Sequence, residues 1–353
     1  MKRYLYIMFI ISAIGVNGQS GDNVEGTLRL LSGDAAEKYL APVVSAFGSN
    51  LNSGWVSSIP PAVTTELNIK LSISAQGSFF SDGMKHFTSS GNFRFNEQQA
   101  RTIVDNSVNA DEEVKDYIIG RILSETFNLS IAGPTIIGNK DQEVTVLFPG
   151  ETYSTPYGTY TVESMEIFTG AKGFLGQIPL LPMAAVQLNV GTFYGTEAAF
   201  RFFPGIKLGD LGEYSLFGVG IITNPEPYLT FLKPLPFNLG LGVFYQTMEV
   251  DGLFESSATQ FGFYASKQIG LFIPYGSITF ESSSTTVTYE YEFSIVTGDN
   301  TETLTVIEKV DLESKNNIGL TLGSKFKFGF FGLFIDFKLA KTSTFNTGIS
   351  FSF

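Results

Sequence analysis

The sequence predicts an all-β protein, an antiparallel transmembrane β-barrel of about fourteen strands within a range of roughly twelve to sixteen. Three observations support this prediction. Many segments of about ten residues alternate between apolar and polar side chains, which is the length and period of a tilted membrane-spanning strand. The 353 residues include 34 Phe and 15 Tyr, but only 16% are charged. The final residues alternate in the same way and end on Phe353.

Residues 1–18 have the pattern of a cleavable secretory signal peptide. Lys2 and Arg3 precede an apolar run, and the small residue Gly18 stands at the expected cleavage position. Beyond this segment, no stretch reaches the roughly 18 uninterrupted apolar residues of a membrane-spanning helix. An exported chain of this kind is either a soluble β-protein or a barrel. We predict the barrel, located in the Gram-negative outer membrane with outer-membrane lipid as a partner.

Residues 19–60 are predicted to form an amino-terminal segment and a helical hatch at the inner mouth of the barrel. Asp34 and Glu37 have capping-box spacing, and apolar residues from Tyr39 to Phe47 recur at helical spacing. The helix is expected to break or restart at Pro42. From their position and type, five hatch residues are predicted to lie nearest the route of a solute: Tyr39, Phe47, Asn50, Asn52 and Trp55.

Residues 61–353 supply the predicted barrel. In the clearest strand, apolar residues from Leu67 to Phe79 alternate with polar ones from Asn68 to Gln76. Charged side chains are tolerated on the polar side only if that side faces a wet lumen. They either set the selectivity of the lumen or form a mutually neutralising network that stiffens the wall. The charged residues predicted to line the lumen are Glu197, Arg201, Lys267, Glu290, Glu292, Lys325, Lys327, Asp336 and Lys338.

Residues 96–150 interrupt the strand pattern and are predicted to be an insertion between barrel strands. Helical stretches are expected to start at Asn96 and Asp111. Two further barrel strands are expected near residues 126–132 and 141–149. The insertion could form a periplasmic cap, a lumen plug or an extracellular loop.

The composition excludes several classes of function. The chain has no Cys and one His, so cysteine–histidine catalysis and multi-histidine metal sites are not expected. A serine hydrolase would have to use His86 with Ser89 or Ser90, an arrangement that more often reflects ordinary surface residues. A net charge of −12 argues against nucleic acid as a partner. We therefore predict no enzyme activity, no cofactor and no metal.

Several clusters resemble an uncharacterised family of exported Gram-negative proteins that carries only a domain-of-unknown-function label. The resemblance supports the barrel but implies no activity. It rests on Tyr39 to Pro42, Ala46 to Gly48, Leu51 to Trp55, Phe200 to Pro204, Phe217 to Gly220, Ala265 to Lys267 and Pro274 to Gly276.

Two further resemblances concern assembly and architecture. The end of the chain at Phe353 resembles the signal read by the barrel-assembly machinery, which is thus an expected partner. The architecture looks like that of the long-chain fatty-acid transporter family, which has an amino-terminal hatch and fourteen strands. The predicted function is passive transport or binding of a small hydrophobic solute. The alternative is a non-transporting anchor that uses residues 96–150 as an interaction platform.

Overall fold

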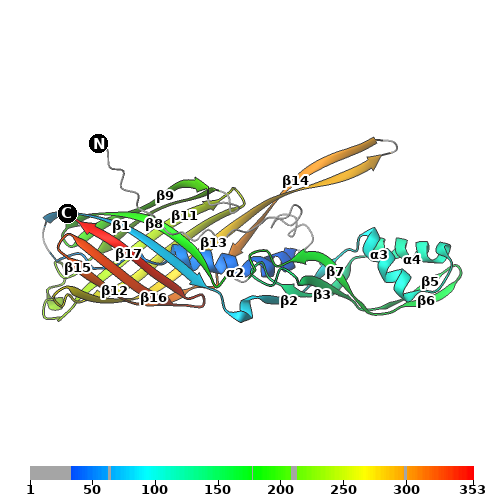
Figure 1. The fold of residues 1–353 in the computed structure, drawn as a ribbon, viewed down its shortest axis with the longest axis horizontal. Coiled ribbons are helices and arrows are strands. Elements are labelled where there is room, and N and C mark those ends of the chain that lie inside the picture. Colours follow the sequence, from blue (N-terminus) through cyan, green and yellow to red (C-terminus); the bar gives the residue numbers. More distant parts are fainter. Residues whose placement is uncertain (1–32, 63–64, 177, 208–212, 298–299) are drawn as a thin grey trace, which may run out of the picture.

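The structure is a computed structural model. It describes residues 33–62, 65–176, 178–207, 213–297 and 300–353 (Figure 1). The predicted signal peptide, residues 1–18, lies outside the described residues.

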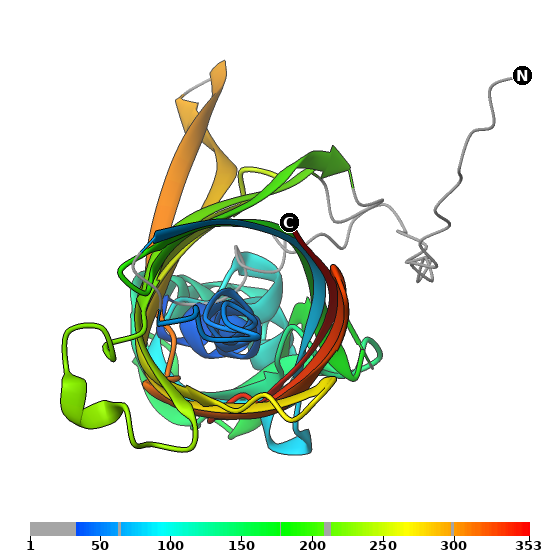
Figure 2. The ribbon, with the colours of Figure 1, turned by 90° about the vertical axis from the view of Figure 1, so that its left-hand side faces the viewer.

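Ten antiparallel strands close into a barrel, as the ring in Figure 2 shows. Each strand pairs with the next, and closure comes from β17 pairing with β1 and from β12 pairing with β13. In ring order the strands are β1 (Thr65–Phe79), β8 (Leu180–Phe193), β9 (Thr196–Lys207), β10 (Glu213–Thr223), β11 (Asn238–Val250), β12 (Phe254–Ser266), β13 (Phe272–Thr297), β15 (Ile318–Phe328), β16 (Phe331–Leu339) and β17 (Thr344–Ser352).

The all-β barrel prediction is confirmed, but the ring has ten strands instead of about fourteen. The segments near residues 126–132 and 141–149 are strands, yet they belong to a separate sheet. The second half of β13 pairs with β14 (Asn300–Glu313) in a hairpin. This hairpin continues past the ring, since the pairing of β13 with the ring strand β12 stops at Val287. Period-two alternation identifies a strand but not the sheet that the strand joins.

The chain between β1 and β8, from Phe80 to Pro179, leaves the barrel and forms an elongated extension along its axis (Figure 1). This extension is larger than the predicted insertion at residues 96–150. A sheet in the order β2-β3-β4-β7 carries the helices α3 and α4 and the hairpin β5-β6 at its far end. The elements are η1 (Asp82–Met84), β2 (His86–Phe93), α3 (Glu97–Ser107), α4 (Glu112–Ser124), β3 (Phe127–Pro134), β4 (Glu143–Phe148), β5 (Glu151–Thr155), β6 (Gly158–Val162) and β7 (Met165–Lys172).

The helix α3 begins where the sequence predicts. The Asn96 side chain accepts a hydrogen bond from the Gln99 backbone, and the Gln99 side chain accepts one from the Asn96 backbone, completing a capping box. Lys115 of α4 then reaches Asp105 of α3 at 2.9 Å, and this hydrogen bond raises the pKa of Lys115. The two helices are thereby joined at the far end of the extension.

The helix α2 (Gly33–Leu51) joins the extension to the barrel. It runs continuously through Pro42, so the predicted break is wrong. Proline removes one intrahelical hydrogen bond, but Tyr39, Leu40 and Val43 around it are almost fully buried, and this packing holds the helix together. The first half of α2 belongs to the same hydrophobic core as the extension sheet. The second half enters the barrel, where Figure 2 shows it inside the ring.

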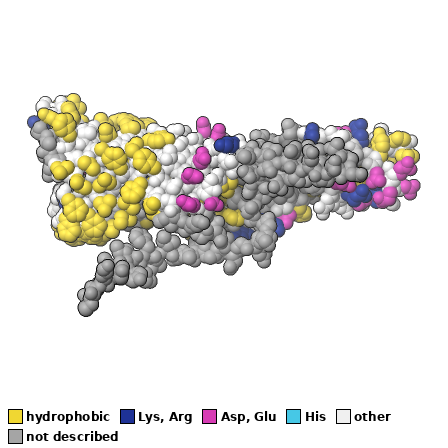
Figure 3. Space-filling view, turned by 90° about the horizontal axis from the view of Figure 1, so that it is seen from above, with side chains coloured by type: hydrophobic (Ala, Val, Ile, Leu, Met, Phe, Trp, Pro, Cys, Tyr) yellow, Lys and Arg dark blue, Asp and Glu magenta, His cyan; other side chains and the backbone are white. Residues whose placement is uncertain are grey.

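The outer face of the barrel is apolar. Outward positions such as Phe217, Ile221 and Val243 are exposed, and Figure 3 shows hydrophobic side chains covering the barrel, with acidic side chains just beyond them towards the extension. In the part of the chain that the structure describes, no helix is long and apolar enough to cross a membrane. A soluble protein would not expose such a continuous apolar band to water, whereas a closed barrel with this exterior satisfies its backbone within lipid.

The barrel has two different ends, named here by what lies at each. At the terminal end, β1 begins and Phe353 exchanges backbone hydrogen bonds with Ile69 at 2.8 and 3.1 Å. At the extension end lie the extension, the hairpin of β13 and β14, and the entry of α2. The chain therefore passes through the lumen from the extension end to the terminal end before β1 starts.

Candidate functional site: the plugged lumen

The lumen is filled by residues 45–60, called the plug here, which comprise the end of α2 and the segment after it. Along β1 the inward positions Lys70, Ser72, Ser74, Gln76 and Ser78 are all polar and buried. A polar wall can hold the plug only if its buried groups find partners, because unpaired buried polar groups are costly. The plug supplies many of these partners.

Lys338 of β16 holds the carboxyl end of α2. Its Nζ donates to the carbonyl oxygens of Ser49 at 2.9 Å and Asn52 at 3.4 Å, and to Glu281 Oε2 at 2.9 Å. Because α2 ends at Leu51, the Ser49 carbonyl lies in the last helical turn, where helix carbonyls lack intrahelical partners. A cation at this position also complements the helix dipole. Lys338 and Glu281 are both almost completely buried, so this ion pair lies inside the lumen.

Arg201 of β9 binds the plug from the other side of the lumen. Its Nη1 donates to the Ser53 carbonyl at 3.0 Å and to Gln246 Oε1 at 3.1 Å. Its Nε and Nη2 both donate to Gln187 Oε1, at 3.1 and 2.9 Å. The guanidinium is therefore satisfied by neutral oxygens and has no carboxylate partner in the described lumen.

Trp55, the only tryptophan of the chain, packs directly on this guanidinium. Arg201 Cζ lies 3.9 Å from the centre of the indole ring, within the range of a cation–π contact. Phe244 also stacks on the indole, with its ring centre 4.7 Å from that of Trp55. Gln187 Nε2 donates to the Trp55 carbonyl at 2.9 Å, so side chain and backbone of Trp55 are both held.

Short polar side chains complete the attachment of the plug. Ser49 Oγ lies 2.7 Å from Thr344 Oγ1, and Asn50 Oδ1 accepts from Ser78 Oγ at 2.7 Å. Asn50 Nδ2 also donates to the Leu181 carbonyl at 2.9 Å. The plug is thus bonded to wall strands around the ring.

The predicted lumen residues fall into three groups. Glu197, Arg201, Lys325, Asp336 and Lys338 are buried at inward positions of the wall. Lys267 and Lys327 are exposed, the first in the turn after β12 and the second near the end of β15, so neither lines the lumen. Glu290 and Glu292 lie in the part of β13 that pairs only with β14, past the ring, so their predicted lumen position is wrong. At a strand end or in a protruding hairpin, the side chains that follow the inward pattern no longer point into the lumen.

The predicted route residues do not line a free path. Asn50, Asn52 and Trp55 are buried in the filled lumen. Phe47 packs on Phe254 with ring centres 5.6 Å apart, and Tyr39 Oη donates to the Lys172 carbonyl at 2.9 Å, at the junction with the extension. These residues fix the plug between the extension and the wall.

The structure also brings together residues that the sequence analysis did not select. Lys70 Nζ lies 3.2 Å from Glu197 Oε1, which also accepts from Asn189 at 2.6 Å. Tyr275 donates to Asp336 at 2.7 Å. Lys70 was visible on a polar strand face, but Glu281 precedes the run of Ser and Thr at residues 282–286, where no alternation marks the inward side.

His86 and its neighbouring serines are not arranged as a nucleophile and base. His86 and Ser90 share the exposed face of β2, four residues or about 13 Å apart along the strand. Ser89 lies on the opposite, buried face.

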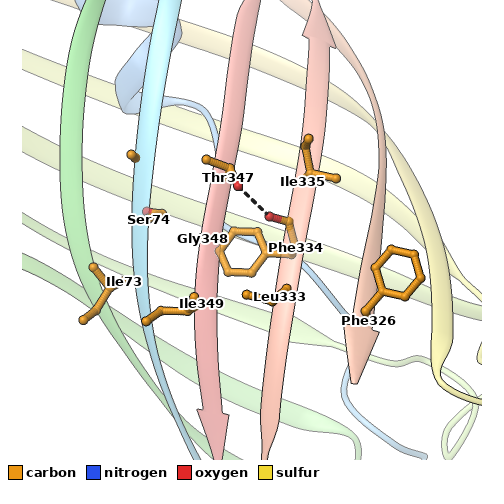
Figure 4. A pocket seen from close by; sticks show the side chains of 10 residues that line it. Ile73, Ser74, Phe326, Leu333, Phe334, Ile335, Thr347, Gly348 and Ile349 are labelled. Carbon is orange, nitrogen blue, oxygen red and sulfur yellow. Dashed lines mark hydrogen bonds between the residues drawn. The ribbon is translucent and has the colours of Figure 1, made fainter. Parts of the chain in front are cut away.

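A groove of about 400 Å³ lies in the wall formed by β1, β15, β16 and β17 (Figure 4). Strand alternation places most of its lining on the lipid-facing side. In Figure 4 the ring of Phe334 lies beside Gly348, and Thr347 Oγ1 donates to the Phe334 carbonyl at 3.1 Å. The lining residues are Ile73, Ser74, Ala75, Phe326, Leu333, Phe334, Ile335, Thr347, Gly348 and Ile349.

Comparison with known proteins adds a family but no activity. A family model described as a family of unknown function (DUF6588) matches residues 1–353. No curated protein matches the chain. Among solved structures, the amino-terminal β-barrel domain of Pseudomonas aeruginosa OprF is 14% identical, with 45% of this chain and 94% of that chain covered and a TM-score of 0.21.

Two other solved barrels are similarly distant. OmpT, an outer membrane protein of Vibrio cholerae, is 9% identical over 82% of this chain and 97% of its own, with a TM-score of 0.18. The β domain of the Bordetella autotransporter BrkA is 9% identical over 82% of this chain and 100% of its own, with a TM-score of 0.21. At these scores nothing about the function of this chain follows from the likeness.

Proposed function

The chain belongs to the DUF6588 family of unknown function, and we propose from its geometry that it is a sealed outer-membrane anchor that presents the extension as an interaction platform. The observation that carries the proposal is the plug, which is bonded to wall strands around the ring. Outer-membrane lipid surrounds the barrel, and the machinery that recognises the strand ending at Phe353 assembles it. The proposal gives the chain no catalytic, cofactor-binding or metal-binding role.

The plug is too strongly held to leave the lumen as part of an ordinary transport cycle. Hydrogen bonds to charged groups contribute about 1.5–3 kcal/mol each, and Lys338 and Arg201 together make several of them to the plug. Withdrawing α2 would also pull its first half out of the core that it shares with the extension. A stationary plug is therefore the lower-energy arrangement.

The lengths of the connections support an orientation in which the extension faces the cell exterior. At the terminal end, the turns Tyr194-Gly195 and Gly329-Phe330 are only two residues long, and the longest connection is residues 224–237. At the extension end the connections include the whole extension and the protruding hairpin. In outer-membrane barrels the short turns face the periplasm and the long loops face outwards.

The extension offers a surface suited to a protein partner. In the sheet, Thr145 pairs with Phe168 and Leu147 with Glu166, so Leu147 and Phe168 are diagonal neighbours on the same face. Both are exposed, Phe168 by 63%. We propose that these two side chains are part of the surface that contacts the partner.

The chain has no cysteine, so single introduced cysteines can test the orientation. Ser154→Cys places an exposed thiol on β5 in the extension, and Gln268→Cys places one in a turn at the terminal end. With a membrane-impermeant maleimide on intact cells, we expect labelling of the first variant only, and labelling of the second after the outer membrane is permeabilised. The reverse pattern would refute the platform.

A second candidate function, binding of a hydrophobic solute, is favoured by the wall groove. Its lining includes Phe326, Leu333, Ile335 and Ile349, which could hold an acyl chain without any movement of the plug. Leu333→Ser should then weaken binding of a fluorescent fatty acid to the barrel in detergent, while Val243→Ser on the far wall should not. Equal binding by both variants would remove this candidate.

A further inference from the structure

The terminal half of the lumen holds buried charges that the plug does not use. Counted around the ring, β9 and β15 lie on opposite sides, with β1 between them along one arc. Their inward residues Glu197 and Lys325, and Lys70 of β1, are all buried. All three lie in the half of their strands nearer the terminal end. They therefore share one section of the lumen.

Positive charge exceeds negative charge in this section. Lys70 is paired with Glu197 at 3.2 Å, and Asn189 also donates to that carboxylate. Lys325 is a second buried lysine of this section, and Lys327 lies two residues further along β15, at the exposed rim. This section thus holds one carboxylate and two buried ammonium groups, and the exposed Lys327 adds a third positive charge at its rim.

Lys325 has no direct partner among the residues that the structure describes. No hydrogen bond or ion pair joins its Nζ to any of them, although only 3% of the residue is exposed. Lys338, by comparison, is equally buried and donates to Glu281 and two carbonyl oxygens. Burying an ammonium group without a hydrogen-bond acceptor costs free energy. We therefore expect a hydrogen-bond acceptor, preferably with negative charge, beside Lys325.

A second unpaired polar group lies beside Lys325. Ser350 Oγ is buried and has no hydrogen-bond partner in the described structure. Gly332 of β16 separates the two side chains: a Cβ on this glycine would lie 2.7 Å from Lys325 Cε and 2.8 Å from Ser350 Oγ. An ammonium and a hydroxyl are thus adjacent in the lumen, and both can donate to the same oxygen.

We propose that this section of the lumen binds a small oxyanion, of the phosphate or carboxylate class, between Lys325 and Ser350. Two neighbouring donors, one of them charged, suit an oxygen ligand with a negative charge. Lys70 and Lys327 add to the positive potential, and Glu197 limits it, so a singly or doubly charged anion fits better than a highly charged one. Because Lys70, Glu197 and Lys325 lie in the half of the lumen nearer the terminal end, the anion enters from that end.

The test measures how inorganic phosphate changes the thermal stability of the folded full-length barrel in detergent. The readout is the temperature at which the heat-modifiable gel band shifts, with chloride used to match ionic strength. A ligand that binds only the folded state raises this temperature, by about 3 °C at roughly ten times the Kd. We expect a saturable rise with phosphate in the unaltered protein, and a smaller one with acetate.

Lys325→Met should abolish the rise, and Ser350→Ala should reduce it. Lys267→Met, which removes an exposed lysine at the same end, should leave the rise unchanged. If Lys325→Met does not fold, equilibrium dialysis of labelled phosphate against Ser350→Ala and the unaltered protein decides. The proposal is overturned if neither phosphate nor acetate raises the transition temperature, if Lys325→Met retains the rise, or if Ser350→Ala binds phosphate as the unaltered protein does.

Discussion

At the scale of single residues, the barrel places cations where backbone carbonyls need donors. Lys338 and Arg201 each donate to backbone carbonyl oxygens of the plug. In both cases the acceptor in the plug is a carbonyl oxygen and not a carboxylate. Glu281 holds Lys338 in place, whereas glutamine side chains hold Arg201. The inward charges therefore act mainly as structural donors to the plug.

Lys338→Met should destabilise the barrel strongly because it leaves Glu281 buried without its counter-ion. Breaking a buried pair in this way costs about 3–5 kcal/mol. The double variant Lys338→Met with Glu281→Leu should recover part of the loss. Urea-dependent unfolding of the three proteins in detergent measures the difference, and a double variant less stable than the single one would contradict the pairing.

Arg201→Ala should change the environment of Trp55. Losing the guanidinium removes the cation–π contact and the donor to Ser53, so water can reach an indole that is now only 4% exposed. Because the chain has one tryptophan, its fluorescence reports on this site alone. We expect emission at longer wavelength for Arg201→Ala and no change for Arg121→Ala, which alters an exposed arginine of α4. Identical spectra for both would show that Arg201 does not shield the ring.

At the scale of elements, the sequence was most informative where one strand face meets lipid and the other meets the lumen. The period-two pattern predicted β1 and β17 and placed Lys325 and Lys338 at inward positions, because burial there follows alternation. The pattern failed for Lys327 and Glu290, because a strand can continue beyond the barrel wall, where neither of its faces points into the lumen. Glu281 could not be assigned to the inward face, because the Ser and Thr residues that follow it do not alternate with apolar residues.

Pro42 shows a different limit of sequence reasoning. Local propensity predicts a break in α2, but the helix is buried on several sides by the extension and the barrel rim. Tertiary packing supplies more stability than one lost backbone hydrogen bond removes. Propensity alone contains no information about this packing.

Gly54 marks the turn that directs the plug away from α2, and it should not tolerate alanine. Its φ is +69°, and an added Cβ would lie 2.8 Å from Asn346 Oδ1. Gly54→Ala should cost about 1–2 kcal/mol from the backbone alone, and more from this contact. Gly252→Ala is the matched control, because its φ is +71° but no atom lies within 4 Å. Equal losses in urea-dependent unfolding would show that the lumen around Gly54 is not tightly packed.

At the scale of the whole molecule, one chain builds an apolar barrel, a polar plug and a projecting extension that share a continuous core. The fold class followed from the sequence because composition and alternation act over the entire barrel. The strand number did not, because the extension sheet has the same alternation and is excluded from the ring only by its pairing. The filling of the lumen was not predictable either, since it depends on contacts between residues more than a hundred positions apart, such as Gln187 and Trp55.

The central claim, that the plug seals the barrel, is tested most directly by conductance in a planar lipid bilayer. We predict that the unaltered protein shows no steady open channel, while a variant without residues 33–60 does, provided that its heat-modifiable mobility shows a folded barrel. A steady open conductance of the unaltered protein, at the level of the plug-free variant, would contradict the account.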